Sequence, residues 1–516
     1  MSRFLPLLIF VIWMSSPATA AVLGLNPLPA SALFLGFYIA LVVILAAWSR
    51  HVARSAHFNN VQRRLRRFNT VIYASRILIP VWLGVGVFAL GWKDVIAGAL
   101  EKTPLGGLPI DMPGLILGCL PSFLAWMGLW WAQFPADRAL REQNILIQLN
   151  ENLPLHPPPS FGKYFIVNLR LQLLFTIAPA ILLLTLHDLL SLILPPIFAH
   201  IPILAHRQEI GESLITLPAL LIFLIFSPEL LRRVLHCETL PDCPLRRRLF
   251  EIARRHGVRF HDVLLWKTQN QMGNAAVMGF IPRFRYVLIS DLLLETMHDE
   301  QIEAIFAHEI GHVTHRHLYW LIAAMVAMMF VLAGPGQMLA DFIASLQGQH
   351  VWLADSLQLA IMLGAAIGVF ALVFGYISRK FERQADVFAA RAIQGAAALA
   401  PTPAPALPAE HFQTAGTAII EDPPPAHGVS IVGRHGAAVF CSALERVAAV
   451  NNIPVAARSW CHGSISKRMR FLEFLSRDSR RTAQFDRFMQ WLYLVLIVSL
   501  LAFGVWTMLA LKGWPA

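Results

Sequence analysis

Long apolar stretches separated by polar, arginine-rich segments dominate the pattern of this chain. A helix that crosses a bilayer needs about 20 mostly apolar residues, because each residue adds only about 1.5 Å along the axis. After the N-terminal segment, eight stretches approach this length, the fifth being the shortest: residues 30–48, 71–90, 113–134, 171–194, 214–226, 321–343, 353–376 and 488–511. We therefore expect a bundle of membrane-spanning helices.

The first twenty residues follow a different pattern. Arg3 precedes an apolar run from Phe4 to Met14, and small residues surround Ala18 and Ala20. This arrangement is typical of a cleavable secretory signal peptide. An uncleaved first helix is the alternative, and both interpretations place Ala21 on the outer side of the membrane.

Composition agrees with a membrane protein. The chain has 56% hydrophobic and 14% charged residues, with a mean hydropathy of +0.57, so it is far more apolar than an ordinary globular domain. Two long regions interrupt the apolar stretches, residues 229–319 and 378–487. We expect these regions to form a polar lobe outside the lipid.

Arginine and lysine gather in alternate loops. Positive residues near span ends stay in the cytoplasm, and the basic loops after the first and third spans and before the last fall on one side. This alternation places residues 229–319 and 378–487 in the cytoplasm. The same loops would face anionic lipid headgroups, which explains the formal net charge of +11. We therefore expect no nucleic-acid partner.

The first polar region contains patterns typical of short elements. Residues 245–255 have helical spacing, and residues 263–266 are typical of a strand. Thr296 or Asp299 can cap the next helix, which we expect to continue past His317 into the sixth span.

The second polar region contains an unusual segment. Residues 395–425 are rich in alanine and proline and lack hydrophobic periodicity, which predicts an extended or disordered loop. Ordered structure should resume near Ala437 with an amphipathic helix around residues 443–447.

A His-Glu-x-x-His pattern lies in the first polar region, at His308, Glu309 and His312. Residues four apart share one face of a helix, so both imidazoles can reach one zinc ion, with Glu309 beside them as the general base. The alternative is that these residues fall on a helix by accident.

A carboxylate that the two-histidine site lacks occurs downstream. A catalytic zinc takes three protein ligands and keeps one open position, and Glu382 is the natural third ligand. Asp386 follows one helical turn later, placed to accept a hydrogen bond from a ligating imidazole and fix its tautomer.

With these residues the chain resembles the M48 family of integral-membrane zinc metallopeptidases, which includes HtpX-like and Ste24-like proteases. In that family a β-hairpin pairs with an extended substrate, and residues 274–279 and 286–291 resemble its two strands. The resemblance implies that Asn274, Ala275 and Gly279 bind substrate. It also implies a role for His462 in stabilising the oxyanion, from a late His-x-x-x-x-x-Arg element, although Gly463 stands where the family has proline.

Two other histidines follow the motif closely, His315 and His317. His315, three residues after His312, could approach the metal only with a distorted turn, and His317 is rotated well away on a continuous helix. We therefore interpret both as polar-surface or interfacial histidines rather than ligands.

Ionisable residues also occur within the fourth apolar stretch, at His187 and Asp188. Such residues are functional candidates by default. A break near Pro195 and Pro196 would instead place them at an interface, and both interpretations stay open.

The cysteines number five, and four of them lie in regions predicted to be cytoplasmic, where thiols stay reduced. No disulfide framework is expected. Cys461 beside His462 suggests a nucleophile or a fourth ligand, but a packed free thiol is the favoured interpretation.

The expected fold is mostly α: a polytopic membrane helical bundle with a gluzincin-type metallopeptidase lobe that contains a small β-hairpin or sheet. Its predicted parts are a signal peptide (1–20), an N-terminal transmembrane region (21–228), two catalytic segments (229–319 and 378–487), a transmembrane hairpin between them (320–377) and a last helix (488–511).

The expected function is a zinc endopeptidase, with one Zn²⁺ per chain, that cleaves peptides or membrane proteins by means of a metal-activated water. It would serve membrane-protein quality control in a bacterial inner membrane, with its site facing the cytoplasm. The alternatives are a CaaX-type prenyl-peptide protease and a non-catalytic metal-binding chaperone or scaffold. Neither the substrate nor the oligomeric state follows from the sequence.

Overall fold

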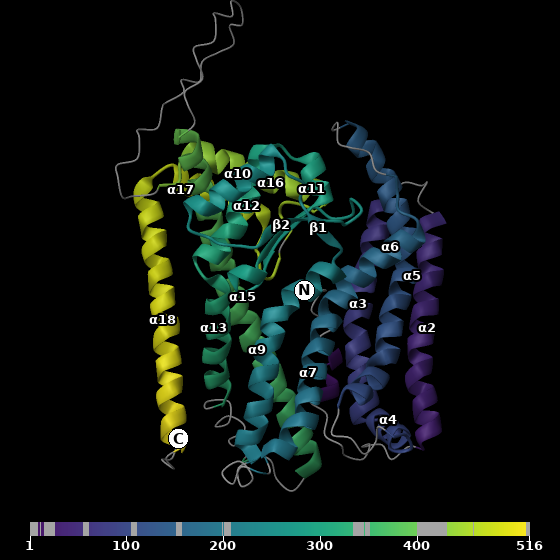
Figure 1. The fold of residues 1–516 in the computed structure, drawn as a ribbon. Helices are drawn as coiled ribbons and strands as arrows, with labels where there is room; N and C mark the ends of the chain where they lie inside the picture. Colours follow the sequence, from purple (N-terminus) through teal and green to yellow (C-terminus); the bar gives the residue numbers. More distant parts are fainter. Residues whose placement is uncertain are drawn as a thin grey trace, which may run out of the picture. The chain divides into compact units, whose positions relative to one another are not determined.

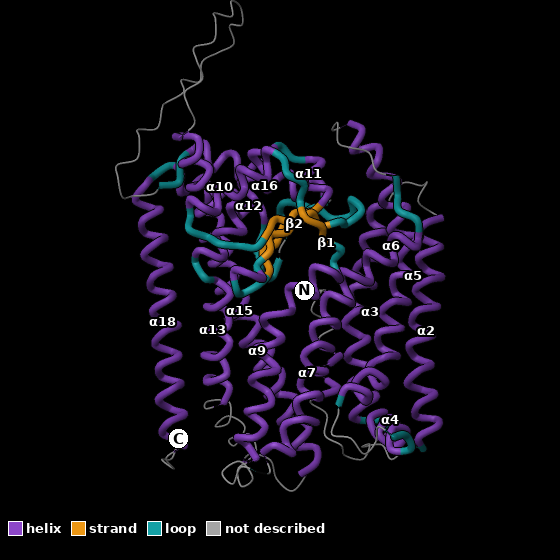
Figure 2. Tube along the Cα trace, in the orientation of Figure 1, coloured by secondary structure: helices purple, strands orange, loops and turns teal. Residues whose placement is uncertain are grey.

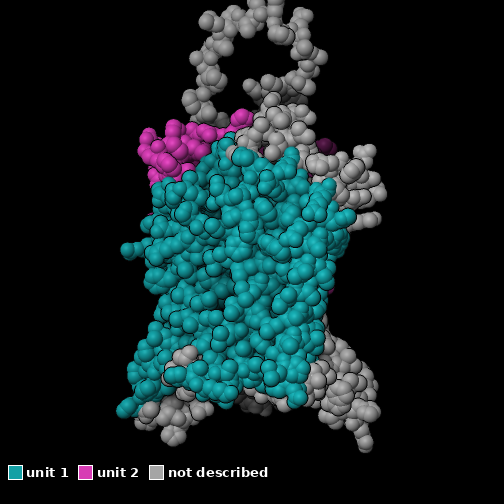
Figure 3. All heavy atoms as spheres, turned by 90° about the vertical axis from the view of Figure 1, so that its right-hand side faces the viewer, with its two compact units in different colours: residues 1–239, 260–272, 278–296 teal, residues 240–259, 273–277, 297–516 magenta. Residues whose placement is uncertain are grey.

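The computed structural model describes most of the chain, namely residues 9–10, 12–14, 26–54, 61–104, 111–150, 157–198, 200, 208–333, 345, 351–399, 431–451, 453–457 and 459–511. Helices dominate, with one small sheet (Figure 2). The chain forms two compact units, coloured in Figure 3: residues 1–239, 260–272 and 278–296, and residues 240–259, 273–277 and 297–516.

Long helices build most of the first unit (Figure 1). Helix α5 packs against α2, α3 and α7, and α7 packs against α9. Their bounds are α2 (Pro27–Arg54), α3 (Val61–Phe88), α4 (Trp92–Glu101), α5 (Met112–Asn150), α6 (Phe161–Asn168), the π-helix η2 (Leu169–Leu174), α7 (Phe175–Phe198) and α9 (Gln208–Val234). Trp126, Trp130 and Phe34 fill the core between these helices, each fully buried.

Six helices of the described residues are long and apolar enough to cross a membrane: Pro27–Arg54, Thr70–Phe88, Met112–Ala139, Phe161–Phe198, Leu214–Val234 and Ser479–Trp506. Large apolar side chains such as Ile39, Leu221 and Leu501 are exposed on these spans, as is expected of surfaces that face lipid. The chain is therefore a multi-span membrane protein, and these helices coincide with predicted spans one to five and eight.

Two details of the predicted spans are decided by the structure. The fifth span is longer than predicted, because α9 continues to Val234. The alternative of a break at Pro195 and Pro196, left open above, does not occur, because both prolines lie inside α7 and the fourth stretch is one continuous span. Neighbouring groups can satisfy the backbone that prolines leave unbonded in a membrane helix, which is why a proline pair is a weak stop signal there.

Asp188, left open by the sequence, has a structural partner. Its carboxylate is buried and accepts a hydrogen bond from the backbone N–H of Met112, the first residue of α5, at 3.0 Å. His187 lies beside it, with Nδ1 at 3.8 Å from Asp188 Oδ1. Because the first turn of α5 contains no acidic residue, Asp188 caps that helix from α7.

The N-terminal segment is described only in part. Ile9, Phe10 and Trp13 are buried in the core of the first unit, and the other predicted signal-peptide residues lie mostly outside the described ones. Cleavage of this segment stays a prediction.

The sheet has the strand order β1-β2-β4-β3, with β1 (Cys237–Thr239), β2 (Asp262–Trp266), β3 (Ala275–Met278) and β4 (Tyr286–Ser290). Strand β2 pairs antiparallel with β1 and parallel with β4. The three predicted strands are present, whereas β1 was not foreseen because three residues are too few to show a periodic pattern. Two short helices flank β4: η3 (Pro282–Phe284) and α11 (Asp291–Thr296).

Helices also dominate the second unit: α10 (Pro244–Arg255), α12 (Asp299–Thr314), α13 (His317–Ala333), α15 (Val351–Leu399), α16 (Arg434–Val450), α17 (Ile465–Ser476) and α18 (Ser479–Leu511). Helix α12 packs against α10, α15 and α16, and α13 packs against α15 and α18. The predicted seventh span lies within α15. The predicted sixth begins in α13, and its end lies outside the described residues.

The ends of α12 differ from those predicted. Neither Thr296 nor Asp299 caps it, because His298 is the N-cap and its N–H donates to Gln301 Oε1 at 3.2 Å. Nor does the helix run on into the sixth span. It ends at Thr314, Arg316 has a left-handed φ of 55°, and α13 begins at His317.

Residues 395–399 are helical, in contrast to the prediction of a loop from residue 395, because α15 extends to Leu399. Most of residues 395–425 lie outside the described residues. Helix α16 begins at Arg434, slightly before the predicted start of an ordered segment near Ala437.

Candidate metal centre

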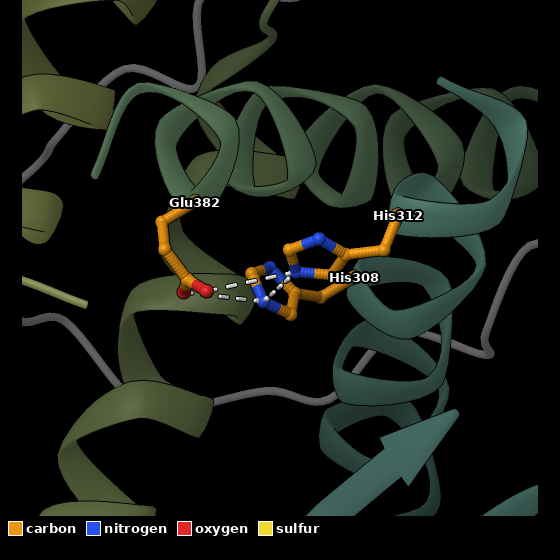
Figure 4. Close-up of side chains that lie close together, drawn as sticks. All are labelled: His308, His312 and Glu382. Carbon is orange, nitrogen blue, oxygen red and sulfur yellow. Dashed lines mark hydrogen bonds and ion pairs between the residues drawn. The ribbon is translucent and has the colours of Figure 1, made fainter. Parts of the chain in front are cut away.

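Three side chains from two helices of the second unit meet at one point (Figure 4). His308 and His312 lie one turn apart on α12, and Glu382 reaches toward them from α15. The two imidazole Nε2 atoms are 3.3 Å apart, and each lies 3.7 Å from a carboxylate oxygen of Glu382.

A glycine lets the two helices approach this closely. A Cβ added at Gly311 would lie 3.1 Å from Phe388 Cδ1 and 3.2 Å from Ala385 Cα on α15, tighter than ordinary van der Waals contact. The glycine inside the His-Glu-x-x-His pattern therefore sets the separation of the helices that carry the three side chains.

The proton positions on the two imidazoles follow from their outer partners. His308 Nδ1 lies 3.0 Å from Asp386 Oδ1, and His312 Nδ1 lies 2.8 Å from His317 Nδ1. With the protons on Nδ1, both Nε2 atoms present lone pairs to each other. Two lone pairs 3.3 Å apart repel unless a cation lies between them, so the arrangement fits a metal ion.

The donor set and its dimensions fit zinc. Two histidines and one glutamate are a known set for catalytic zinc, and tetrahedral ligands about 2.0 to 2.1 Å from the metal lie roughly 3.4 Å from one another. The observed separations of 3.3 and 3.7 Å are close to this value.

Asp386 is fully buried and forms a forked ion pair with Arg468 on α17. The guanidinium donates from Nε to Asp386 Oδ2 at 2.9 Å and from Nη2 to Oδ1 at 2.5 Å. Its Nη1 also lies 3.4 Å from Glu382 Oε2. Arg468 therefore holds both the metal-binding carboxylate and the carboxylate that orients His308.

Burial and charge act in opposite directions on these acids. Burial alone would raise the pKa of Glu382, but the hydrogen bond with His462 and the charge of Arg468 outweigh it and lower that pKa well below its usual range. Burial would also raise the pKa of Asp386, but the charge of Arg468 outweighs this effect and lowers that pKa. Burial lowers the pKa of His312 to about 4, which keeps its imidazole neutral and able to bind a metal.

Glu309 lies next to the ligands but in different surroundings. Burial raises its pKa to about 7, the largest effect on this group. Its Oε2 accepts a hydrogen bond from the backbone N–H of Val277, in β3, at 3.1 Å. A carboxyl group that titrates near neutrality can both take up and release a proton there.

His462 lies at the tip of a tight turn, closed by a β-bridge between Ser459 and Gly463. Its Nδ1 is 2.8 Å from Glu382 Oε1, and its side chain is mostly exposed. Gly463 has φ of 74°, which proline cannot adopt because its ring fixes φ near about −65°. A proline at position 463 is therefore incompatible with this turn.

Trp460 anchors the same turn to α15. Its indole N–H donates to the carbonyl of Ala371 at 2.8 Å, and its ring stacks on Phe374 at 5.6 Å between centroids. Its own carbonyl accepts from Arg379 at 2.8 Å. A Cβ at Gly375 would lie 2.6 Å from the indole nitrogen, so this glycine makes room for the ring.

The predicted substrate-binding residues lie at the two ends of β3. Ala275 is its first residue and Asn274 precedes it. Gly279 follows it with φ of 105°, and a Cβ there would collide with the carbonyl of Phe284. Gly279 therefore serves a turn, and its role in substrate binding stays a prediction.

His317 is not the surface histidine that the sequence predicted. It is 2% exposed and contacts His312, because the turn at Arg316 replaces the continuous helix on which the prediction depended. His315 is half-buried, and its Nδ1 lies 2.9 Å from the carbonyl of Gly311 near the end of α12. All five cysteines are free.

Comparison with known proteins identifies part of the chain. Residues 241–415 match the family model of Peptidase family M48, and they contain His308, Glu309, His312, Glu382 and Asp386. This segment is similar to the M48 peptidases.

The M48 segment has relatives among bacterial, archaeal and plant proteins. A Protease HtpX homolog of Aeropyrum pernix is 26% identical over 180 residues, 34% of this chain and 55% of the relative. A CAAX prenyl protease 1 homolog of Arabidopsis thaliana is 30% identical over 162 residues, 30% of this chain and 37% of the relative. The chain thus spans about half the length of these relatives or less.

Among solved structures, the crystal structure of S. mikatae Ste24p matches with a TM-score of 0.42 and 12% identity, over 86% of this chain and 99% of that one.

Several residues that shape the M48 site were not assigned a role by the sequence. Arg468 was visible only as the end of the His-x-x-x-x-x-Arg element, and a buried arginine next to two acids gives no periodic signal. Trp460 and His317 depend on turns whose backbone conformation no pattern predicted.

Proposed function

We propose that this protein is a membrane-embedded zinc endopeptidase. The observation that carries the proposal is the convergence of His308, His312 and Glu382, with Glu309 on the same helix. These three ligands would hold one Zn²⁺, which when bound polarises the scissile carbonyl and lowers the pKa of water.

The chain's own residues then divide the proton transfers. Glu309 lies between the two histidine ligands in the chain of α12 and is placed to take a proton from the attacking water and return it to the leaving nitrogen. Asp386 keeps the proton of His308 on Nδ1, which leaves Nε2 to bind. His462 remains our candidate donor to the oxyanion, held beside Glu382 by its turn.

Strand β3 is the proposed substrate platform. It is the last strand in the sheet order. The N–H of Val277 donates to the carboxylate of Glu309. Because alternate residues of a strand direct their backbone groups to the same side, Ala275 directs its groups to the side of β3 that Glu309 contacts. An extended peptide bound there would place its backbone next to the base, as strand addition requires.

The cellular role is proposed from the sequence pattern. The placement of arginines supports a cytoplasm-facing site in a bacterial inner membrane. The proposed role in membrane-protein quality control rests on the resemblance to HtpX-like proteases, and two relatives carry that name. The relative from Arabidopsis thaliana favours a second candidate, cleavage of prenylated CaaX peptides. Comparing a farnesylated peptide with its unmodified form would separate the two.

Hydrolysis of a fluorescence-quenched peptide by the detergent-purified protein tests the proposal. Glu309→Gln should lower turnover by at least about 100-fold, as expected on loss of a general base. Glu300→Gln, an exposed glutamate in the first turn of the same helix, is the matched control and should cleave normally. A Glu309→Gln protein as active as the control, or activity that persists in chelator, would contradict the proposal. No hydrolysis by the unmodified protein would favour the scaffold alternative.

A further inference from the structure

His317, Gln384 and Tyr493 form a hydrogen-bonded series behind His312. We propose that His317 is a positioning residue of the metal centre, which fixes the tautomer and ring orientation of His312 and ties this ligand to the C-terminal span α18. The inference rests on the proposed zinc site and adds three residues to it.

A backbone turn creates the contact. Helix α12 ends at Thr314, and Arg316 takes φ of 55°, so the chain changes direction before α13 begins at His317. The turn brings the imidazole of His317 against that of His312, with ring centroids 4.9 Å apart and nearly perpendicular at 78°.

Proton positions along the series are determined by its last members. Tyr493 O–H donates to Gln384 Oε1 at 2.6 Å, and the same oxygen lies 2.9 Å from His317 Nε2. An amide oxygen only accepts, so His317 Nε2 carries the proton and its Nδ1 is an acceptor. That acceptor lies 2.8 Å from His312 Nδ1, which must then be the donor.

The series therefore fixes which nitrogen of His312 carries the proton and which one can bind a metal. With its proton on Nδ1, its Nε2 presents a lone pair toward His308 and Glu382. With these proton positions every group in the series is neutral and every hydrogen bond has a donor and an acceptor. The series can therefore be buried without the cost of burying a charge or an unpaired polar group.

Packing keeps the ring of His317 in place. It stacks on Phe381 with centroids 4.4 Å apart and planes parallel within 1°, and it is only 2% exposed. Phe381 precedes the ligand Glu382, and Gln384 follows it by two residues. His317 thus joins the two helices that supply the ligands, and Tyr493 extends the connection into α18.

Two substitutions separate positioning from space filling. Asn places its side-chain oxygen where the histidine has Nδ1, whereas Gln places its side-chain nitrogen near Nε2. His317→Asn therefore keeps the acceptor for His312, and His317→Gln keeps only the donor for Gln384. We expect His317→Gln to weaken zinc binding about 10- to 100-fold, as loss of a ligand's outer partner does, and His317→Asn to weaken it clearly less.

The measurement is the zinc dissociation constant by competition with a chromophoric chelator, accompanied by the absorption spectrum of the Co²⁺-substituted protein. A changed Co²⁺ spectrum in His317→Gln but not in His317→Asn supports the proposal. Equal losses, no loss, or a greater loss in His317→Asn would overturn it, because Gln is nearer to histidine in volume.

Tyr493→Phe supplies a test that removes only one hydroxyl group. It should weaken zinc binding by a smaller factor and add nothing in the His317→Gln background, since that background has already lost the link to His312. If the losses of zinc affinity from Tyr493→Phe and His317→Gln add, the two residues do not act through one hydrogen-bonded series. His435→Asn, on exposed α16 surface, is the control that should bind zinc normally.

Glu382→Ala, measured alongside, separates the two claims. If Glu382→Ala binds zinc as tightly as the unmodified protein, the metal site itself is wrong. If it loses zinc while the His317 variants do not, only the positioning role is wrong.

Discussion

The backbone N–H of Val277 donates to the Oε2 of Glu309 over 3.1 Å, and this bond connects strand β3 to the proposed base. The strand is held at its other end by Asn451, which donates to the carbonyl of Gly273 at 2.7 Å and accepts from its N–H at 3.0 Å. The position of the strand relative to the base thus depends on a side chain from the end of α16.

Asn451→Ala should therefore impair substrate binding more than chemistry. Loss of two hydrogen bonds, each worth about 1 kcal/mol, should raise KM for a peptide roughly tenfold or more while kcat changes less. Steady-state kinetics check this, with zinc content measured to show that the metal centre is intact. An unchanged KM would mean that β3 does not depend on this clamp.

Arg468→Met should destabilise the fold. It leaves the buried Asp386 carboxylate without its partner, which typically costs about 3–5 kcal/mol, whereas Arg468→Lys keeps the charge but loses the fork and should cost less. Denaturant unfolding of the metal-free proteins ranks the variants. Equal stability of Arg468→Met and the unmodified protein would show that Asp386 does not need the guanidinium.

Restoring the family's proline should damage this chain. Gly463→Pro cannot adopt φ of 74°, and Gly463→Ala strains the same turn by about 1–2 kcal/mol. We expect peptide turnover to fall in the order glycine, alanine, proline, with zinc content unchanged. Gly98→Ala, where nothing lies within 4 Å of the added methyl group, is the control. A fully active Gly463→Pro protein would refute the role of the turn.

Trp460 and His462 should act as one unit. If the indole serves to place the imidazole, Trp460→Ala and His462→Ala each lower kcat, and the double variant is no worse than His462→Ala alone. A double variant whose loss equals the product of the single losses would show that Trp460 acts independently of His462.

Features that depend on neighbouring residues in the chain can be predicted from the sequence, whereas features that depend on tertiary contacts cannot. The spacing of His308 and His312 needs only a helix, and the apolar stretches need only length, so both were predictable. Glu382 was placed by its resemblance to a family motif, and Gly311 makes the close helix contact that brings it within reach.

The conformations of the turns could not be predicted from the sequence. A left-handed residue at Arg316 is unusual for an arginine, so a continuous helix was the natural expectation, and it gave His317 the wrong surroundings. The cap of α12 was missed for a similar reason, since histidine is not among the favoured capping residues. In both places tertiary contacts outweighed the local preference.

Zinc content per chain, compared between Glu382→Ala and Glu309→Gln, tests the central claim most directly. The account predicts one tightly bound zinc in Glu309→Gln, which keeps all three ligands, and a large loss of zinc in Glu382→Ala, both measured by elemental analysis after dialysis against a weak chelator. Full zinc occupancy in Glu382→Ala would contradict a centre built from His308, His312 and Glu382.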